Sequence, residues 1–347
     1  MNKHLNFNDL VSQAWENYDS SRTIISFTDV SARVSTNHVF KIVLDTGTVI
    51  IAKISYFGTF KHFLEDHSLV NALAINLPDP YDQFISRSLT KGNELYTYRH
   101  QDSVLDAWVV FYNPIKIKNT LPKILDEDQI KNLGREAANF HKYCTNIKNI
   151  LPSGSKTMNT DLSHLLRLID TPDGQYEHRG NIDVIKEQIN IFKENSLGLG
   201  TKSWAPIPVF VDWNIGNFSL SEDGKFFSRW DYDWFRMSSR VVDFYFFSRV
   251  CSTIGDREEF SYVIDPLNED RFILFLIEYH KVFPLTKPEV LFIKEAYRFF
   301  ILNYVVKDGR YFFHEIFATK LQREAYEIYF PNIDQLDTNK ILNALNL

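Results

Sequence analysis

The chain has 347 residues, which suits two domains or one large two-lobed domain, because single hydrophobic cores rarely extend beyond about 250–300 residues. Hydrophobic residues make up 44% of the chain and charged residues 24%, an ordinary globular composition that excludes a disordered or fibrous protein. Acidic residues outnumber basic ones by 44 to 38, so the chain lacks the basic excess that draws proteins to nucleic acid or to anionic membranes.

The start of the chain and its apolar runs show no pattern of export or membrane insertion. Polar residues interrupt the first turns before an apolar stretch can build up, which differs from a secretory signal. The apolar runs at 241–247 and 271–279 are far shorter than a membrane span. Cys144 and Cys251 are the only cysteines, and they stand in no metal-type or redox-type spacing. We therefore expect a cytoplasmic protein without a disulfide or structural zinc, and with neither nucleic acid nor a membrane as its partner.

Residues 23–56 have the pattern of a β-hairpin. Two runs rich in β-branched residues, 39–44 and 49–56, flank a short turn that contains Gly47. From Phe60 onward apolar residues recur near helical spacing as far as Leu73, which predicts a helix packed against the hairpin.

Two further strands are predicted at 95–98 and 108–112, and Pro114 follows them as a natural break. We place a lobe boundary at this break. The first lobe, 1–112, is expected to be small and rich in β-structure, and the second, 113–347, to be larger.

The second lobe begins with the clearest helix of the chain, residues 126–143, which starts with acidic residues suited to a helix N-terminus. Residues 151–160 are rich in Ser, Gly, Thr and Asn and predict a loop. The other predicted elements are a short strand at 206–211, a hairpin made of 218–220 and 226–230, and a mainly helical region from 241 onward.

Oxygen-bearing side chains gather around this hairpin. Asp212 and Asn217 stand five residues apart after a strand, and Asp231 follows the hairpin. Mg²⁺ prefers hard carboxylate and amide oxygens and needs few of them from the protein when nucleotide phosphates and water complete its coordination. Asn217 and Asp231 are therefore the expected metal ligands.

Phosphoryl transfer also needs a carboxylate that orients the attacking hydroxyl group, and in kinases it precedes the metal-binding Asn on the same loop. Asp212 occupies that place and is the candidate catalytic base. Each of these residues by itself is equally typical of an ordinary turn, since Asp and Asn are favoured there for their local hydrogen bonds. Their joint spacing around one hairpin favours the functional interpretation.

These motifs resemble those of the aminoglycoside phosphotransferase and choline kinase group, the small-molecule relatives of protein kinases. That group usually has a His-Gly-Asp segment with an Asn five residues after the Asp, then a hairpin and an Ile-Asp-Trp/Phe-Glu/Asp segment. This chain has Phe210-Val211-Asp212, Asn217 and a Trp-Asp-Tyr-Asp segment at 230–233. Phe210 and Val211 replace the usual His and Gly, so the hydrogen bonding that steadies the loop must come from elsewhere.

The resemblance extends to the first lobe, where Lys53 in the run VIIAKI matches the strand lysine that reaches the nucleotide phosphates. Kinases pair this lysine with a carboxylate on the next helix, which makes Glu65 its expected partner, with the adjacent Asp66 as the alternative. The loop at 31–37 matches the phosphate-covering turn of the group, so the hydroxyls of Ser35 and Thr36 are candidate phosphate contacts, although a plain β-turn is equally consistent with the sequence. Asp243 matches a later Asp that often buttresses the catalytic loop in this group, and a cap at the start of a helix is an equally good interpretation of it.

The resemblance implies an α+β, two-lobed protein-kinase-like fold. It also implies a Mg²⁺-dependent enzyme that transfers the γ-phosphoryl group of ATP or GTP to a small hydroxyl compound such as an aminoglycoside, choline, homoserine or a sugar. The alternative is a pseudokinase-like module that binds a nucleotide or a partner without turnover, and the altered Phe210-Val211 pair favours it. Retention of Lys53, Asp212 and both metal ligands favours the enzyme.

Overall fold

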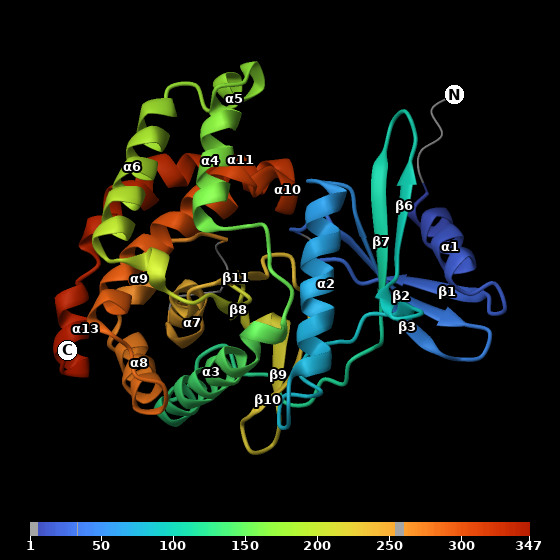
Figure 1. Cartoon of the computed structure of the whole chain (residues 1–347), viewed down its shortest axis with the longest axis horizontal. Coiled ribbons are helices and arrows are strands. Elements are labelled where there is room, and N and C mark those ends of the chain that lie inside the picture. Colours follow the sequence, from blue (N-terminus) through green and yellow to red (C-terminus); the bar gives the residue numbers. More distant parts are fainter. Residues whose placement is uncertain (1–5, 33, 254–259) are drawn as a thin grey trace.

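The computed structural model describes residues 6–32, 34–253 and 260–347 (Figure 1). An antiparallel sheet occupies one end of the molecule, and helices from the later part of the chain make up most of the other end (Figure 1). Helix α2 (Phe60–Asn76) stands between the sheet and these helices. This arrangement confirms the expected small β-rich first lobe and larger helical second lobe.

The sheet of the first lobe has five antiparallel strands in the order β1-β2-β3-β7-β6. Their bounds are β1 (Ile24–Asp29), β2 (His38–Leu44), β3 (Val49–Ser55), β7 (Asp106–Tyr112) and β6 (Thr97–Gln101), and a separate ribbon pairs β4 (Thr90–Lys91) with β5 (Glu94–Leu95). Strands β2 and β3 form the predicted hairpin, and Gly47 in its turn has a φ of 78°, a conformation that glycine adopts without steric cost. Strand β3 lies between two partners, so Lys53 is opposite Val39 on one side and Val110 on the other.

The two faces of this sheet pack against different helices. Helix α1 (Phe7–Tyr18), to which the sequence analysis assigned no element, buries Val11 and Trp15 against the sheet in a hydrophobic cluster of the first lobe. Helix α2 was predicted, but its buried residues Leu69 and Leu73 belong to the large cluster of the second lobe. The helix after β3 is therefore shared by both lobes, and the boundary at 112/113 stays a prediction.

Helix α3 (Glu127–Ile147) confirms the clearest helix prediction. Asp126 and Gln129 form a capping box that satisfies the first backbone N–H groups. The helix packs closely along α8 (Asp270–Val282), and Gly134 permits this approach because a Cβ atom there would lie 2.5 Å from the Phe275 carbonyl oxygen.

The predicted loop at 151–160 is shorter than expected. Thr157 caps α4 (Met158–Ile169), whose start falls inside that stretch, because the Thr157 hydroxyl accepts a hydrogen bond from the Thr160 N–H at 3.1 Å. The other helices of the second lobe are α5 (Pro172–Glu177), α6 (Ile182–Gly198), α7 (Phe244–Cys251), α9 (Lys287–Phe300), α10 (Gly309–Phe312), α11 (Glu315–Glu324), α12 (Phe330–Asn332) and α13 (Thr338–Leu345), with π-helical turns at Ile301–Lys307 and Ala325–Tyr329.

Two small antiparallel pairs gather the loops of the candidate site. Strand β8 (Ile207–Val209) pairs with β11 (Arg236–Ser238). Between them in the chain lies the predicted hairpin of β9 (Phe218–Leu220) and β10 (Phe226–Arg229). The segment 210–217 joins β8 to β9, and the segment 230–235 joins β10 to β11. Because β8 pairs with β11 and β9 pairs with β10, these two segments come together in space. None of the helices in the described part of the chain is long and apolar enough to cross a membrane.

Candidate functional site

Asp212, Asn217 and Asp231 lie around one end of the β9–β10 hairpin. The Trp230 N–H donates a hydrogen bond to the Asn217 carbonyl oxygen at 3.0 Å, which extends the hairpin and sets Asn217 beside the segment that carries Asp231. The Arg229 guanidinium then donates through Nη2 to the Asp212 carbonyl oxygen at 2.6 Å and reaches the Asp231 carbonyl oxygen at 3.5 Å. The hairpin thus brings the three predicted residues together.

Arg229 is the residue that holds this arrangement, and the sequence analysis did not identify it. Its side chain is fully buried, and its guanidinium lies 4.1 Å from the Phe210 ring and 4.6 Å from the Trp213 ring. Burial lowers the pKa of Arg229, and the nearby charge of Asp212 opposes that shift. The available signal was a single basic residue at the end of an otherwise apolar hairpin strand.

The loop that carries Asp212 is steadied by a buried chain of hydrogen bonds. The Val211 N–H donates to Asp243 Oδ1 at 2.7 Å, the other Asp243 oxygen lies 2.9 Å from His141 Nε2, and His141 Nδ1 lies 2.7 Å from the Tyr279 hydroxyl. Asp243 and His141 are both fully buried. These hydrogen bonds steady the loop in which Phe210 and Val211 replace the usual His and Gly. Asp243 contacts that loop directly, as expected of the buttressing residue.

Val211 has a φ of 62°, which is a true outlier for a β-branched residue. The kinase group whose motifs this chain resembles usually has Gly at this position, where a positive φ carries no steric cost. The hydrogen bond from Val211 to Asp243 and the packing of its fully buried side chain hold the strained backbone in place. The loop therefore stores strain next to Asp212.

We expect Val211→Gly to destabilise the protein less than Val209→Gly, by about 1–3 kcal/mol. Both valines are fully buried, so glycine removes the same packing at each position, but of the two only Val211 has a positive φ and gains relief of strain. Urea unfolding followed by tryptophan fluorescence measures both free energies. Equal losses would show that Val211 is not strained.

Lys53 does not pair with either carboxylate expected from α2. Its Nζ forms an ion pair with Asp233 and lies 3.7 Å from Asp231 Oδ1. Burial opposes the positive charge of Lys53, but the two carboxylates outweigh this effect and raise the pKa of Lys53 above its ordinary value. The lysine is therefore charged and faces the segment that carries the candidate metal ligand.

The expected Lys53–Glu65 pair is wrong, because Glu65 faces the loop before α4. Its carboxylate accepts hydrogen bonds from the Ser155 N–H and, at 2.6 Å, from the Ser155 hydroxyl. The alternative partner, Asp66, forms an ion pair with Lys156. Both carboxylates therefore lie on the face of α2 that contacts the second lobe. Residue spacing alone does not reveal which face of a helix is turned towards which lobe.

Thr36 differs from its expected role at the phosphates, whereas the role of Ser35 stays a prediction. The Thr36 hydroxyl donates to the Tyr311 carbonyl oxygen, and its N–H donates to the Phe312 carbonyl oxygen at 3.2 Å. The Ser35 hydroxyl accepts a hydrogen bond from the Asn37 N–H at 3.1 Å. The Thr36 hydroxyl is thus engaged by protein atoms, because this loop pairs with the end of α10, while the Ser35 hydroxyl keeps a hydrogen that it could donate to a phosphate. Residue 33 of the same loop lies outside the described residues.

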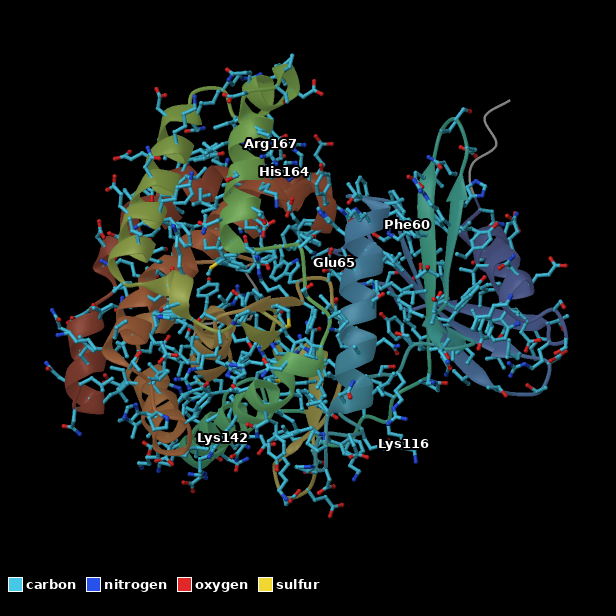
Figure 2. The ribbon with its side chains drawn as sticks, viewed as in Figure 1. Phe60, Glu65, Lys116, Lys142, His164 and Arg167 are labelled. Carbon is cyan, nitrogen blue, oxygen red and sulfur yellow. The ribbon has the colours of Figure 1, made fainter. Side chains whose placement is uncertain are left out.

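Asn37, which follows them, does reach the site. Its Nδ2 donates to Asp233 Oδ2 at 2.7 Å, so Asp233 is held by Asn37 on one oxygen and by Lys53 on the other. A pocket of about 290 Å³ begins at Asn37 and Asp233 and continues between α2 and α4 towards residues 303–312. Figure 2 shows α2 with its labelled residues Phe60 and Glu65, and α4 with His164 and Arg167.

The wall of this pocket carries charges of both signs. Arg236 donates to Asp161 at 2.8 Å, and Lys307 lies 3.3 Å from the same carboxylate. Lys156 pairs with Asp66 nearer to α2, where burial raises the pKa of Asp66 to about 6 against the opposing effect of Lys156. The aromatic rings of residues 57, 63, 232, 234, 235, 304, 311 and 312 make up much of the remaining wall. The pocket therefore suits a small polar molecule with some apolar surface.

The donor set fits a metal ion that arrives with a nucleotide. The Asp231 side chain is 40% exposed, and Asn217, whose backbone is bonded to the Trp230 N–H beside Asp231, carries a side-chain amide oxygen that could join it as a ligand. Within the described ranges no group of three or more His, Cys, Asp or Glu side chains is arranged to hold a metal. Two hard oxygen ligands are too few for a self-contained metal centre but are enough when phosphates supply the others.

Comparison with solved structures finds this architecture in small-molecule kinases. A microcompartment-associated aminopropanol kinase matches with a TM-score of 0.62 at 14% identity, covering 95% of this chain and 99% of its own. The amicoumacin kinase hAmiN matches with a TM-score of 0.61 at 13% identity over 91% of each chain. The choline kinase LicA from Streptococcus pneumoniae matches with a TM-score of 0.56 at 12% identity, covering 95% of this chain and 99% of its own. The chain has the fold of these kinases.

This kinase fold confirms the architecture implied by the motifs around Asp212 and Asp231. No protein-family model matches the sequence, and no curated protein does. Identities of 12–14% establish the fold alone, since one fold supports many activities. The activity must therefore be argued from the residues of the site.

Proposed function

We propose that this protein is a phosphotransferase that moves the γ-phosphoryl group of ATP or GTP to a hydroxyl group of a small molecule. The observation that carries the proposal is that hydrogen bonds to their backbone gather Asp212, Asn217 and Asp231 in a kinase fold. The buried Arg229 holds the two aspartates, and the Trp230 N–H holds Asn217. Two unrelated turn aspartates would have no reason to share one buried guanidinium. Lys53 adds a charged lysine on the same side as Asp231.

In this proposal each residue has one role. Asp212 accepts a hydrogen bond from the acceptor hydroxyl and orients it for direct, in-line attack, with no covalent enzyme intermediate. Asn217 and Asp231 would hold Mg²⁺, which when bound neutralises charge on the phosphates. Lys53 binds the phosphate oxygens. The structure of hAmiN, a complex with AMP-PNP and Ca²⁺, supports nucleotide and divalent cation binding in this fold.

The pocket between α2 and α4 is the proposed acceptor site, because its wall includes Asp233 and Asn37 at the end nearest to Lys53. Asp212 is not part of this wall, so the acceptor hydroxyl must project out of the pocket to reach Asp212. The pocket volume of about 290 Å³ is at the lower end for small-molecule pockets, which favours a compact acceptor over a multi-ring antibiotic. The similar structures are described as kinases of aminoglycosides, choline and aminopropanol, and we propose an acceptor of the smaller kind. Both cysteines are buried and free, which supports a cytoplasmic location.

Phosphate transfer to a panel of hydroxyl metabolites tests the enzyme directly. The purified protein is incubated with γ-labelled ATP or GTP, Mg²⁺ and each of a set of amino alcohols, hydroxy amino acids, sugars and aminoglycosides. We expect transfer to one class of compact acceptor. Nucleotide-dependent thermal stabilisation without transfer to any acceptor would instead favour the pseudokinase-like module, which the strained Val211 supports. Absence of any nucleotide effect would contradict both.

A further inference from the structure

The structure assigns to Asp233 the role of the carboxylate that positions Lys53 for the nucleotide phosphates, in place of any carboxylate of α2. This inference rests on the proposed function and concerns which residue aims the lysine. The first observation is that Lys53 is 7% exposed, so its charge requires a partner inside the protein. In the part of the chain that the structure describes, Asp233 and Asp231 are the carboxylates within ion-pair distance of it.

Helix α2 presents a neutral side chain to Lys53. His67, the residue after Glu65 and Asp66, is 4% exposed and is hydrogen-bonded through Nδ1 to the Tyr112 hydroxyl. Burial, together with the nearby charge of Lys53, lowers the pKa of His67 well below its ordinary value, so the ring is uncharged at neutral pH. The α2 side chain whose pKa Lys53 influences is therefore an uncharged histidine, which does not attract the lysine.

The Asp233 carboxylate is held in a single orientation by two side chains of the first lobe. Lys53 on β3 engages one carboxylate oxygen, and Asn37 from the loop before β2 donates to the other at 2.7 Å. The buried Tyr232 that precedes it is also fixed, because its hydroxyl donates to the Arg229 carbonyl oxygen at 2.7 Å. The carboxylate thus has little freedom to move, which is what a positioning residue needs.

The arrangement ties the lysine to the metal-binding segment. Asp233 lies two residues after Asp231, so the position of Lys53 follows that segment and not the position of α2. A rotation or displacement of α2 would move Glu65 and Asp66 without removing a partner from Lys53. The phosphate-binding lysine and the candidate metal ligand are therefore set by one rigid stretch of chain.

Binding of ADP and of AMP, measured by calorimetry in the presence of Mg²⁺, tests this without any need for turnover; GDP and GMP replace them if the protein prefers guanine. Asp233→Asn keeps the size of the side chain but removes its charge, and we expect it to weaken ADP binding about tenfold. AMP affinity should fall less than ADP affinity, because AMP keeps only the α-phosphate of the two phosphates that the matching kinase lysine contacts. The matched control Glu65→Gln should leave both affinities unchanged.

A double-mutant cycle separates positioning from a general effect on the fold. In a Lys53→Met background, Asp233→Asn should cause no further loss of ADP affinity, whereas Asp233→Glu in the wild-type background should restore most of it. The inference is overturned if the Asp233→Asn variant binds ADP as tightly as the wild type does. It is also overturned if this variant loses as much AMP affinity as ADP affinity, or if Glu65→Gln lowers ADP affinity more than Asp233→Asn does. Wild-type protein that binds no nucleotide would overturn the proposed function together with this inference.

Discussion

Replacing Asp231 by alanine is expected to lower turnover at least about a thousandfold, because the variant loses the only carboxylate among the two proposed metal ligands. Asp231 is partly exposed and faces the open side of the hairpin, so its side chain contributes little to the packing of the core. The rate constant kcat with the acceptor found in the panel measures the effect. Loss of the Mg²⁺-dependent part of ADP binding provides a second readout that requires no acceptor.

Two further variants test whether the loss of turnover comes from the Asp231 carboxylate itself. Asp231 has a φ of 65°, and Asn tolerates that conformation better than Ala, so Asp231→Asn removes the charge with less disturbance of the backbone. Asp223, an exposed acid in the turn of the same hairpin, provides the control, and Asp223→Ala should keep full activity. Near-normal turnover of both Asp231 variants would show that the metal site has been assigned to the wrong residue.

The second large effect is expected at Asp212. Asp212→Asn should lower kcat about 10²–10⁴-fold and leave KM for the nucleotide nearly unchanged, because the residue orients the acceptor hydroxyl and does not bind the phosphates. Asn has the same shape and its side-chain oxygen can still accept the hydrogen bond that the Asn214 N–H donates to Asp212 Oδ1 at 3.0 Å. The variant therefore tests the charge and not the loop.

Steady-state kinetics with both substrates measures this prediction, and circular dichroism checks that the variant is folded. Glu222→Gln, at an exposed acid of the hairpin turn, is the matched control and should behave as the wild type. A rise in KM for the acceptor with kcat unchanged would show that Asp212 binds the acceptor without assisting the transfer. Unchanged kinetics would remove Asp212 from the site altogether.

Much of the fold could be predicted because its signals are local. The β2–β3 hairpin, α2, α3 and the β9–β10 hairpin each follow from periodicity, caps or turn residues within a short stretch. Helix α1 and helices α4 to α6 received no assignment from the sequence. The start of α4 was missed because Thr157 and the residues around it have the composition of a loop, although Thr157 caps a helix.

In the candidate site too, the residues that could be predicted are those joined by local sequence. Asp212, Asn217 and Asp231 were found because a single hairpin joins them, and local spacing records that connection. The partner of Lys53 was not found because the pair joins residues 180 positions apart, and its choice depends on how α2 is rotated against the second lobe. Arg229 was overlooked for a similar reason, since its role depends on backbone carbonyl oxygens whose positions the sequence does not reveal.

The contact between residues 34–37 and the end of α10 has a consequence for motion. In addition to the bonds of Thr36, the His314 N–H donates to the Val34 carbonyl oxygen at 3.1 Å, so two short stretches of backbone join the lobes on the side away from Tyr112. Separation of the lobes at this edge must break several hydrogen bonds at once. Opening of the lobes at this edge therefore costs the loss of these hydrogen bonds together.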